Sequence, residues 1–495
     1  MAKKSKNFVL ATISVDRSSE KLLHLQVYHE LRNALISKRF RAGGRLPSTR
    51  TLADELGISR NTIISAYDQL VAEGYLDCRV GSGTYVTDAL PDDILWLNAE
   101  QKQALPGFGR SEAISNRGKK LAGFAPFFAA VTPKPFRHGL PALDEFPLEL
   151  WTRLTSRRLR RLPRQLLGYG DPLGHRPLRE AIASYLSQSR AVRCDPERII
   201  IVAGSQQALY LTAQVLLDPG DSVWIEDPGY LGARGALMAA EARLVPVPVD
   251  EQGLIVSRGV KLNKDAKLIY VTPSNQYPST VTMSLSRRHE LLEWSARSGA
   301  WVIEDDYDSE FRYKNRPVAA LQGLDRYGRV IYLGTFSKLL APTLRIGYLV
   351  LPPELVDVFS STSSLITRHP PTLQQVVLTD FIEQGHLARH IRRMRGLYLE
   401  RRNELVAACN RELGGLVDIT PPDAGTHLIA WLPDGMDDRI ASRAAAEQGV
   451  ETKPFSDYSL RSTGRGGLVL GYGAFGKKDI RTGMQRLARA LEKVK

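Results

Sequence analysis

Apolar runs of strand length alternate with helical patterns through the last two thirds of this 495-residue chain. The runs are nearly continuous in apolar residues, and they cover residues 199–202, 222–225, 268–271, 301–303, 330–333 and 348–351. Strands of this composition are buried on both faces, which is typical of a sheet with helices packed on each side. The pattern predicts an α/β, doubly wound and mostly parallel sheet over residues 133–495. Ligands in such folds bind beyond the carboxyl ends of the strands.

The first 87 residues predict a separate and smaller unit. Helices are expected over residues 20–39, 50–56 and 60–73, and short strands over 75–80 and 84–87. Ser48 or Thr49 is placed to cap the second helix and Ser59 the third, while Gly57 is free to take the positive φ that ends a helix. Two helices joined by a short glycine turn and followed by a hairpin make a winged helix-turn-helix.

The third helix of this unit carries polar side chains where a recognition helix meets base edges. Arg60, Asn61 and Thr62 stand in its first turn, and the first turn of a recognition helix lies in the major groove. Arg50 and Arg79 are expected on phosphate or in the minor groove. The alternative is a small helical interaction module with solvated arginines. The caps, the glycine turn, the polar face and the wing together favour double-stranded DNA as a partner, and a net charge of +14 agrees with an anionic one.

This stretch resembles the GntR family of bacterial regulators. The resemblance rests on Leu46-Pro47-Ser48-Thr49-Arg50, Leu52-Ala53, Leu56-Gly57, Ser59-Arg60-Asn61-Thr62, Ala66-Tyr67, Leu70 and Glu73-Gly74-Tyr75-Leu76. It implies that Arg50, Arg60 and Thr62 touch DNA, and that residues 20–87 form the DNA-binding domain.

Between the two units the periodicity fades. Residues 88–132 are rich in Pro, Gly, Ser and mixed charges, and they include the basic cluster at 116–120. A stretch of this length without a pattern is unusual inside one compact domain, so an interdomain linker is predicted.

Three residues near strand ends in the larger unit suit an aldehyde cofactor with a pyridine ring. Lys338 stands among hydroxyl residues after the run 330–333, where it could lose its proton and form a Schiff base. Asp305 is expected just after the run 301–303, and a carboxylate there can pair with a protonated pyridine nitrogen. Tyr307 is expected to reach the phenolic oxygen of the ring.

A phosphate group has its own candidate residues. Gly204 precedes a predicted helix that begins with Ser205 and Gln206, and the free N–H groups of a helix start favour an anion. Thr335, Ser337 and Arg345 are expected to complete the phosphate cup. Tyr230 offers an aromatic face for the ring. Each residue alone has an ordinary structural explanation, but their order along the chain favours a cofactor site.

This order resembles a fold-type I aminotransferase that uses pyridoxal phosphate, from about Pro133 to the C-terminus. The resemblance implies a smaller C-terminal subdomain, pyridoxal 5'-phosphate on Lys338, and a phosphate group held by the five residues named above. It also implies that Tyr169, in Gly168-Tyr169-Gly170-Asp171-Pro172, reaches the phosphate of a partner subunit, so that the protein is a homodimer.

Two departures from that pattern bear on activity. Tyr277, in Tyr277-Pro278-Ser279-Thr280, replaces the asparagine that such enzymes place near the ring oxygen. The strand expected around 467–472 lacks their arginine for the substrate carboxylate, although Arg461 and Arg465 stand just before it. These departures predict at most residual aminotransferase activity.

A GntR-like head on an aminotransferase-like body resembles the MocR subfamily of regulators, which includes GabR-like proteins. The resemblance implies a transcriptional regulator that senses a small amine or amino acid. Two alternatives remain: a working aminotransferase with a DNA-binding head, and a sensor of pyridoxal phosphate itself. Neither a metal site nor a membrane span is expected, because Cys78, Cys194 and Cys409 are scattered and no apolar run is long enough. We expect a cytoplasmic protein.

Overall fold

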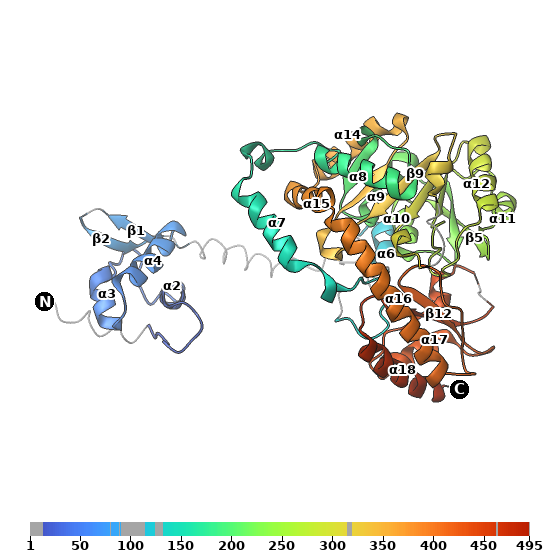
Figure 1. Cartoon of the computed structure of the whole chain (residues 1–495). Helices are drawn as coiled ribbons and strands as arrows, with labels where there is room; N and C mark the ends of the chain where they lie inside the picture. The colour runs from blue at the N-terminus through green and yellow to red at the C-terminus, as the bar shows by residue number, and fades with distance from the viewer. Residues whose placement is uncertain are drawn as a thin grey trace. The chain divides into compact units, whose positions relative to one another are not determined.

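The computed structural model describes residues 13–79, 81–88, 90, 114–123, 132–313, 319–461 and 464–494 (Figure 1). Most of the expected linker, and Val80 in the first expected wing strand, lie outside these residues. The chain divides into two compact units, Met1–Ile114 and Ser115–Lys495.

The N-terminal unit is a winged helix-turn-helix, as predicted. Its elements are α2 (Leu23–Ile36), α3 (Thr49–Leu56), α4 (Arg60–Ala72) and the antiparallel strands β1 (Leu76–Arg79) and β2 (Gly83–Val86). Ser48 Oγ accepts from the Thr51 N–H at 3.1 Å, and Ser59 Oγ accepts from the Asn61 N–H at 3.2 Å. Gly57 takes the left-handed conformation, with φ at +61°, that lets the chain turn between α3 and α4. The serine caps and Gly57 therefore set where α3 begins and ends and where α4 begins.

The core of the C-terminal unit is a mostly parallel sheet, which confirms the predicted fold class. In spatial order its strands are β3 (Ile199–Val202), β10 (Gly347–Val350), β9 (Val330–Thr335), β8 (Trp301–Asp306), β7 (Leu268–Val271), β4 (Ser222–Asp227), β5 (Arg243–Asp250) and β6 (Gly253–Leu254). From β9 to β5 all neighbours are parallel, whereas β10 runs antiparallel to both β9 and β3.

Successive residues of the central strands pack into different apolar cores. In β7, Tyr270 belongs to one buried cluster, and Ile269 and Val271 belong to another. This alternation follows from the two-residue repeat of a strand, and it explains why the runs are apolar at every position. The helices of this layer are α8 (Arg176–Arg190), α9 (Ser205–Leu216), α10 (Leu231–Ala239), α11 (Val256–Leu262), α12 (Leu285–Ser298), α13 (Leu321–Leu324), α14 (Val356–Thr367) and α15 (Thr372–Glu383).

Two details of the sheet differ from expectation. Strand β8 continues to Asp306, so Asp305 lies inside the strand and not just after it, because residues 304–306 are held by parallel pairing to β9. Strand β5 was not predicted from the sequence, because Pro246 and Pro248 interrupt its apolar pattern. It nevertheless pairs with β4 along its length and with β6 at its end.

A smaller C-terminal subdomain is present, as predicted. Its four-stranded sheet has the order β11 (Asp418–Ile419), β12 (His427–Trp431), β14 (Gly467–Gly471) and β13 (Lys453–Pro454). The helices α16 (His386–Glu412), α17 (Asp438–Glu447) and α18 (Lys477–Glu492) pack beside it (Figure 1).

Two further helices precede the large sheet. Helix α7 (Leu148–Arg160) contacts α15, and α6 (Asn116–Ala122) contacts α10. The basic cluster at 116–120 is therefore helical, and Arg117 pairs with Glu241 at 3.3 Å. Among the residues that the structure describes, no helix is long and apolar enough to cross a membrane.

Candidate cofactor site and DNA-binding face

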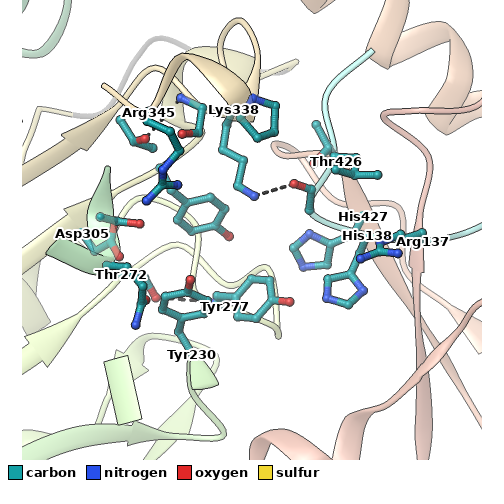
Figure 2. Close-up of a pocket in the computed structure, with 18 of the residues that line it drawn as sticks. Arg137, His138, Tyr230, Thr272, Tyr277, Asp305, Lys338, Arg345, Thr426 and His427 are labelled. Atoms are coloured by element: carbon teal, nitrogen blue, oxygen red, sulfur yellow. Dashed lines mark hydrogen bonds between the residues drawn. The ribbon is translucent and has the colours of Figure 1, made fainter. Parts of the chain in front are cut away.

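A cavity of about 390 Å³ lies at the carboxyl ends of the parallel strands of the C-terminal unit (Figure 2). A volume of this size is typical of a small-molecule site. Ten of the predicted cofactor residues line it, namely Ser205, Gln206, Tyr230, Tyr277, Asp305, Tyr307, Thr335, Ser337, Lys338 and Arg345. The sheet brings them together because β4, β7, β8 and β9 end side by side.

The carboxylate of Asp305 is buried and only half satisfied. Its Oδ2 accepts a hydrogen bond of 2.7 Å from the Tyr270 hydroxyl, while its Oδ1 has no hydrogen-bond partner among the described residues. Burial raises the pKa of Asp305 to about 7, against the lowering effect of the Tyr270 bond. A buried carboxylate oxygen without a partner is costly, and a cationic N–H donor would relieve that cost.

The ammonium of Lys338 points into the same cavity (Figure 2), where it donates to the backbone carbonyl of Gly139. Burial lowers the pKa of Lys338, and the carboxylates of Asp308 and Asp305 oppose this effect. Gly139 has φ at +80°, a conformation that favours glycine, and a Cβ atom there would be in ordinary van der Waals contact with Lys338 Nζ at 3.4 Å. Lowering the pKa of a lysine increases its neutral, nucleophilic fraction.

One end of the cavity is built for an anion. Helix α9 begins at Ser205, directly after Gly204, whose φ is +85°. A Cβ atom on Gly204 would meet the guanidinium of Arg345 at 3.2 Å, so glycine is what lets Arg345 lie across the helix start. Arg345 donates to the Ala203 carbonyl, and Thr335 accepts from the Ser337 N–H at 3.2 Å. Free N–H groups, hydroxyls and a guanidinium at one helix start suit a phosphate.

Aromatic rings form the walls beside the anion end. Tyr230 lies edge-on to Tyr277, with ring centroids 5.8 Å apart, and burial raises the pKa of Tyr230 to about 12. The hydroxyl of Tyr307 donates to the Asn275 carbonyl at 2.9 Å. The hydroxyl of Tyr277 donates to the Tyr458 hydroxyl at 3.2 Å.

The sequence did not predict nine residues that line the cavity. They are Arg137, His138, Gly139, Leu140, Tyr270, Thr272, Pro342, Thr426 and His427. The first four come from the irregular segment before α7, and Thr426 and His427 come from the start of β12. No sequence period marks such positions; the only local signal at the first segment is Gly139 directly after the polar pair Arg137-His138.

Two histidines face the Lys338 side of the cavity (Figure 2). The Nε2 atom of His138 lies 2.9 Å from the Tyr458 hydroxyl, and its Nδ1 is buried without a partner among the described residues. The Nε2 atom of His427 lies 3.1 Å from the Pro278 carbonyl. Burial lowers the pKa of His138 to about 3 and that of His427 to about 4. Both imidazoles are therefore neutral at pH 7.

Three residues singled out in the sequence lie away from the cavity. Tyr169 is 82% exposed, and the Arg368 guanidinium lies over its ring at 5.1 Å. Arg465 pairs with Asp418 and donates to Leu432 O, while the backbone of Arg461 lies beside Asp227. Neither arginine lines the cavity.

The residues expected to bind DNA lie on the N-terminal unit and are accessible. Arg50, Arg60, Asn61 and Arg79 are exposed, and Thr62 is half-buried in the first turn of α4. Arg60 Nε lies 3.4 Å from Thr49 Oγ1, which brings the starts of α3 and α4 together. In the wing, the Arg79 guanidinium lies 4.7 Å from the Tyr85 ring centroid and 3.4 Å from Asp77.

The cavity fits pyridoxal phosphate in its chemistry. Asp305 Oδ1 has no donor among the described residues, the start of α9 with Arg345 offers N–H groups and a guanidinium to an anion, and Lys338 is an amine of lowered pKa in the same space. These are the three groups that a pyridine nitrogen, a phosphate and an aldehyde require.

Comparisons with known proteins agree with both units. Residues 23–86 match the model of bacterial regulatory proteins of the gntR family, and residues 142–466 match the model of aminotransferase class I and II. The chain is 42% identical over 476 residues to the probable rhizopine catabolism regulatory protein MocR of Rhizobium meliloti, covering 96% of this chain and 95% of that protein. It is 34% identical over 476 residues to the uncharacterized HTH-type transcriptional regulator YhdI of Bacillus subtilis, with coverage of 96% and 97%.

A solved structure covers the C-terminal unit. The crystal structure of a multiple substrate aminotransferase from Thermococcus profundus matches with a TM-score of 0.70 and 30% sequence identity, covering 77% of this chain and 97% of that one.

Proposed function

Because the chain belongs to the MocR-type family of transcriptional regulators, in which a GntR head precedes an aminotransferase-like body, we propose that it holds pyridoxal phosphate on Lys338 and changes its DNA binding when a small amine or amino acid enters the cavity. Residues 20–87 are the DNA-binding domain in this proposal, residues 88–132 the linker, whose helix α6 packs on the C-terminal unit, and residues 133–495 the sensing domain.

The observation that carries the proposal is Oδ1 of Asp305, which has no hydrogen-bond partner in the described part of the chain and lies in the same cavity as Lys338. Buried carboxylate oxygens in proteins nearly always have hydrogen-bond partners, and the exceptions concentrate at functional sites. A protonated ring nitrogen would supply the missing donor. The start of α9 with Arg345 would hold the phosphate, and Tyr230 would pack against the ring.

When bound, pyridoxal phosphate supplies an aldehyde carbon that primary amines can attach to. The residues of this chain supply the rest. Lys338 has a pKa lowered by burial, so its amine gives up a proton more readily than an exposed lysine does. Tyr270 holds Asp305 in place through the 2.7 Å bond, and the aromatic walls limit the access of water.

We extend the proposal to a homodimer. Tyr169 is 82% exposed and Leu167 is 71% exposed, both in the segment that leads into α8. A large exposed tyrosine next to an exposed leucine is the kind of surface that protein partners cover. In the aminotransferases that this domain resembles, the matching tyrosine reaches the phosphate of the other subunit.

The experiment that tests the proposal is reduction of the purified protein with borohydride, followed by peptide mapping. We expect a yellow protein whose cofactor is found on the peptide that contains Lys338, and none on that peptide in Lys338→Ala. A colourless protein that stays colourless with added pyridoxal phosphate would refute the proposal.

The two other hypotheses give different results in further assays. Multiple-turnover amino transfer would identify a working aminotransferase with a DNA-binding head. A DNA affinity that changes on adding pyridoxal phosphate, and not on adding any amine, would identify a sensor of the cofactor itself.

A further inference from the structure

The wall of the cavity opposite the anion end contains uncharged hydrogen-bonding groups. His138, Tyr277, Thr426, His427 and Tyr458 come from four separate segments and gather around this wall. The ring centroids of Tyr277 and His427 are 5.3 Å apart, and those of His138 and Tyr277 are 6.1 Å apart.

The hydrogen bonds in this wall engage one nitrogen of each of the two histidines. Tyr277 donates its hydroxyl proton to the Tyr458 oxygen, and the Tyr458 hydroxyl shares a hydrogen bond of 2.9 Å with His138 Nε2. The Nδ1 atom of His138 is buried without a partner among the described residues, so the neutral imidazole can offer a ligand an N–H or a lone pair there. His427 donates through Nε2 to the Pro278 carbonyl, which leaves a lone pair on its Nδ1. The wall thus offers uncharged imidazole nitrogens that a ligand hydroxyl, which both donates and accepts, can pair with.

The strand behind this wall carries no cation. Val469 is fully buried in β14, in an apolar cluster with Ile429, Phe455 and Tyr458, and Tyr277 packs against that cluster. A guanidinium there would be buried among apolar side chains without a counter-ion, which is strongly unfavourable.

Other cations near the wall are Arg137, Lys453 and Lys338. Arg137 lines the cavity, but its Nη1 lies 3.7 Å from Glu451 Oε1, so its charge is compensated. Lys453 is close enough to contribute to the low pKa of His138, yet it does not line the cavity. Lys338 is committed to the cofactor in the proposed function. Among the described residues, a carboxylate at this wall would compete with Glu451 for Arg137 and would otherwise meet neutral groups.

We propose that the amine sensed here carries uncharged hydroxyl groups, not a carboxylate, on the side that faces His138 and His427. The inference rests on the proposed function, since the amino group itself is taken to reach the cofactor on Lys338. His138 Nδ1 pairs with one effector hydroxyl, which can accept or donate, and His427 Nδ1 accepts from another. Sites built to hydrogen-bond a hydroxyl discriminate strongly, because a ligand that lacks it leaves buried groups unpaired.

The test titrates the cofactor-loaded protein with matched pairs of amines and follows the cofactor absorbance. Serinol is compared with serine, and 4-amino-1-butanol with 4-aminobutyrate, while butylamine serves as the probe that lacks both groups. We expect each alcohol to bind about tenfold or more tightly than its acid, and 4-amino-1-butanol to bind more tightly than butylamine. Acids that bind as tightly as the alcohols, or more tightly, would overturn the inference.

Variants locate the effect in the wall. His138→Phe should remove most of the advantage of 4-amino-1-butanol over butylamine, and Val469→Arg should shift the preference toward the acids. If Val469→Arg does not take up cofactor, the double variant His138→Phe with His427→Phe tests the role of the wall instead. Arg137→Ala is the decisive control: an acid preference in the wild type that disappears in Arg137→Ala would place a carboxylate site on Arg137 and refute the inference.

A second readout separates this inference from the proposed function. The affinity for a duplex selected from a random library is measured with each amine of the pairs. A response to acids and not to alcohols would refute the inference and leave the proposed function standing. A protein without cofactor on the Lys338 peptide would refute the proposed function first.

Discussion

The hydroxyl of Tyr270 donates a hydrogen bond of 2.7 Å to Oδ2 of Asp305, between the adjacent parallel strands β7 and β8. The bond holds one carboxylate oxygen inside the sheet and leaves Oδ1 in the cavity. The two residues are 35 positions apart, and parallel pairing makes them neighbours.

The cofactor-free protein should lose stability as the pH rises, partly through Asp305. Burial raises the pKa of this carboxyl from an ordinary value of 3.8 to about 7. A carboxyl with a higher pKa in the folded state binds its proton more tightly when folded, so its contribution is present at low pH and is lost as the pH rises through about 7. Thermal melts of the cofactor-free protein between about pH 5 and about pH 8 measure this loss.

The matched variant for that measurement is Asp305→Asn, which keeps an acceptor for Tyr270 and cannot ionise. Its melting temperature should fall less with pH than that of the wild type. Some dependence of the melting temperature on pH remains in this variant, since burial also raises the pKa of Glu226 to about 7 and of Asp308 to about 8. Equal slopes for the two proteins would remove Asp305 from the explanation.

The end of β8 depends on a buried ion pair. Arg190 Nε lies 2.8 Å from Asp306 Oδ2, with both side chains at most 4% exposed, and Tyr332 donates to the same oxygen at 2.7 Å. Removing one partner of such a pair costs about 3–5 kcal/mol, because the other charge stays buried. Arg190→Met should therefore lower the free energy of unfolding by about that amount in urea titrations.

A surface pair provides the control for that variant. Arg176 contacts Glu197 at 2.9 Å with both side chains more than 60% exposed, so Arg176→Met should leave stability unchanged. The double variant Arg190→Met with Asp306→Asn should lose less than Arg190→Met alone. A loss in the double variant equal to the sum of the single losses would mean that the two residues do not interact.

DNA recognition should separate Arg60 from Arg79. Arg60 stands in the first turn of α4, where a lost base contact costs about 1–3 kcal/mol for the preferred sequence only. Arg79 stands on the wing, where a lost phosphate contact weakens binding to all sequences. Arg60→Ala should reduce the difference in affinity between a selected duplex and random DNA, and Arg79→Ala should lower both affinities.

Fluorescence anisotropy at one fixed salt concentration measures both affinities, because phosphate contacts depend on salt. Arg258→Ala, on the C-terminal unit, serves as the control and should bind as the wild type does. Equal losses on both DNAs for Arg60→Ala would exclude Arg60 from base recognition.

Signalling should require Lys338. A ligand shifts an equilibrium only by its difference in affinity for the two states, typically about 1–3 kcal/mol between sites. Lys338→Ala should still bind the selected duplex, because the DNA-binding residues belong to the other unit, but its response to an amine should disappear or stay fixed in one state. The measurement is DNA affinity with and without the amine for wild type and variant. A full response in Lys338→Ala would favour a sensor that binds its effector without the cofactor.

The sequence by itself determined the parts of this protein that depend on local chemistry. Ser48 and Ser59 cap the helices that follow them directly in the chain, and Gly57 allows the turn between α3 and α4. The winged unit was therefore predictable from residues that are neighbours in the sequence. The strands of the large sheet were predictable for a similar reason, since burial on both faces demands apolar residues at every position. The order of Ser205, Tyr230, Asp305 and Lys338 then predicted the cavity.

Only the tertiary structure decided which groups face one another across that cavity. His138 meets Tyr458 over a separation of 320 residues, and His427 meets Pro278 over 149. Such contacts follow from how the C-terminal subdomain closes on the large sheet, and no local period encodes them. Strand β5 is a similar case, because its two prolines hide the apolar pattern while pairing with β4 and β6 keeps it extended. Long-range packing thus set the chemistry of the effector wall, whereas local patterns set the elements that carry it.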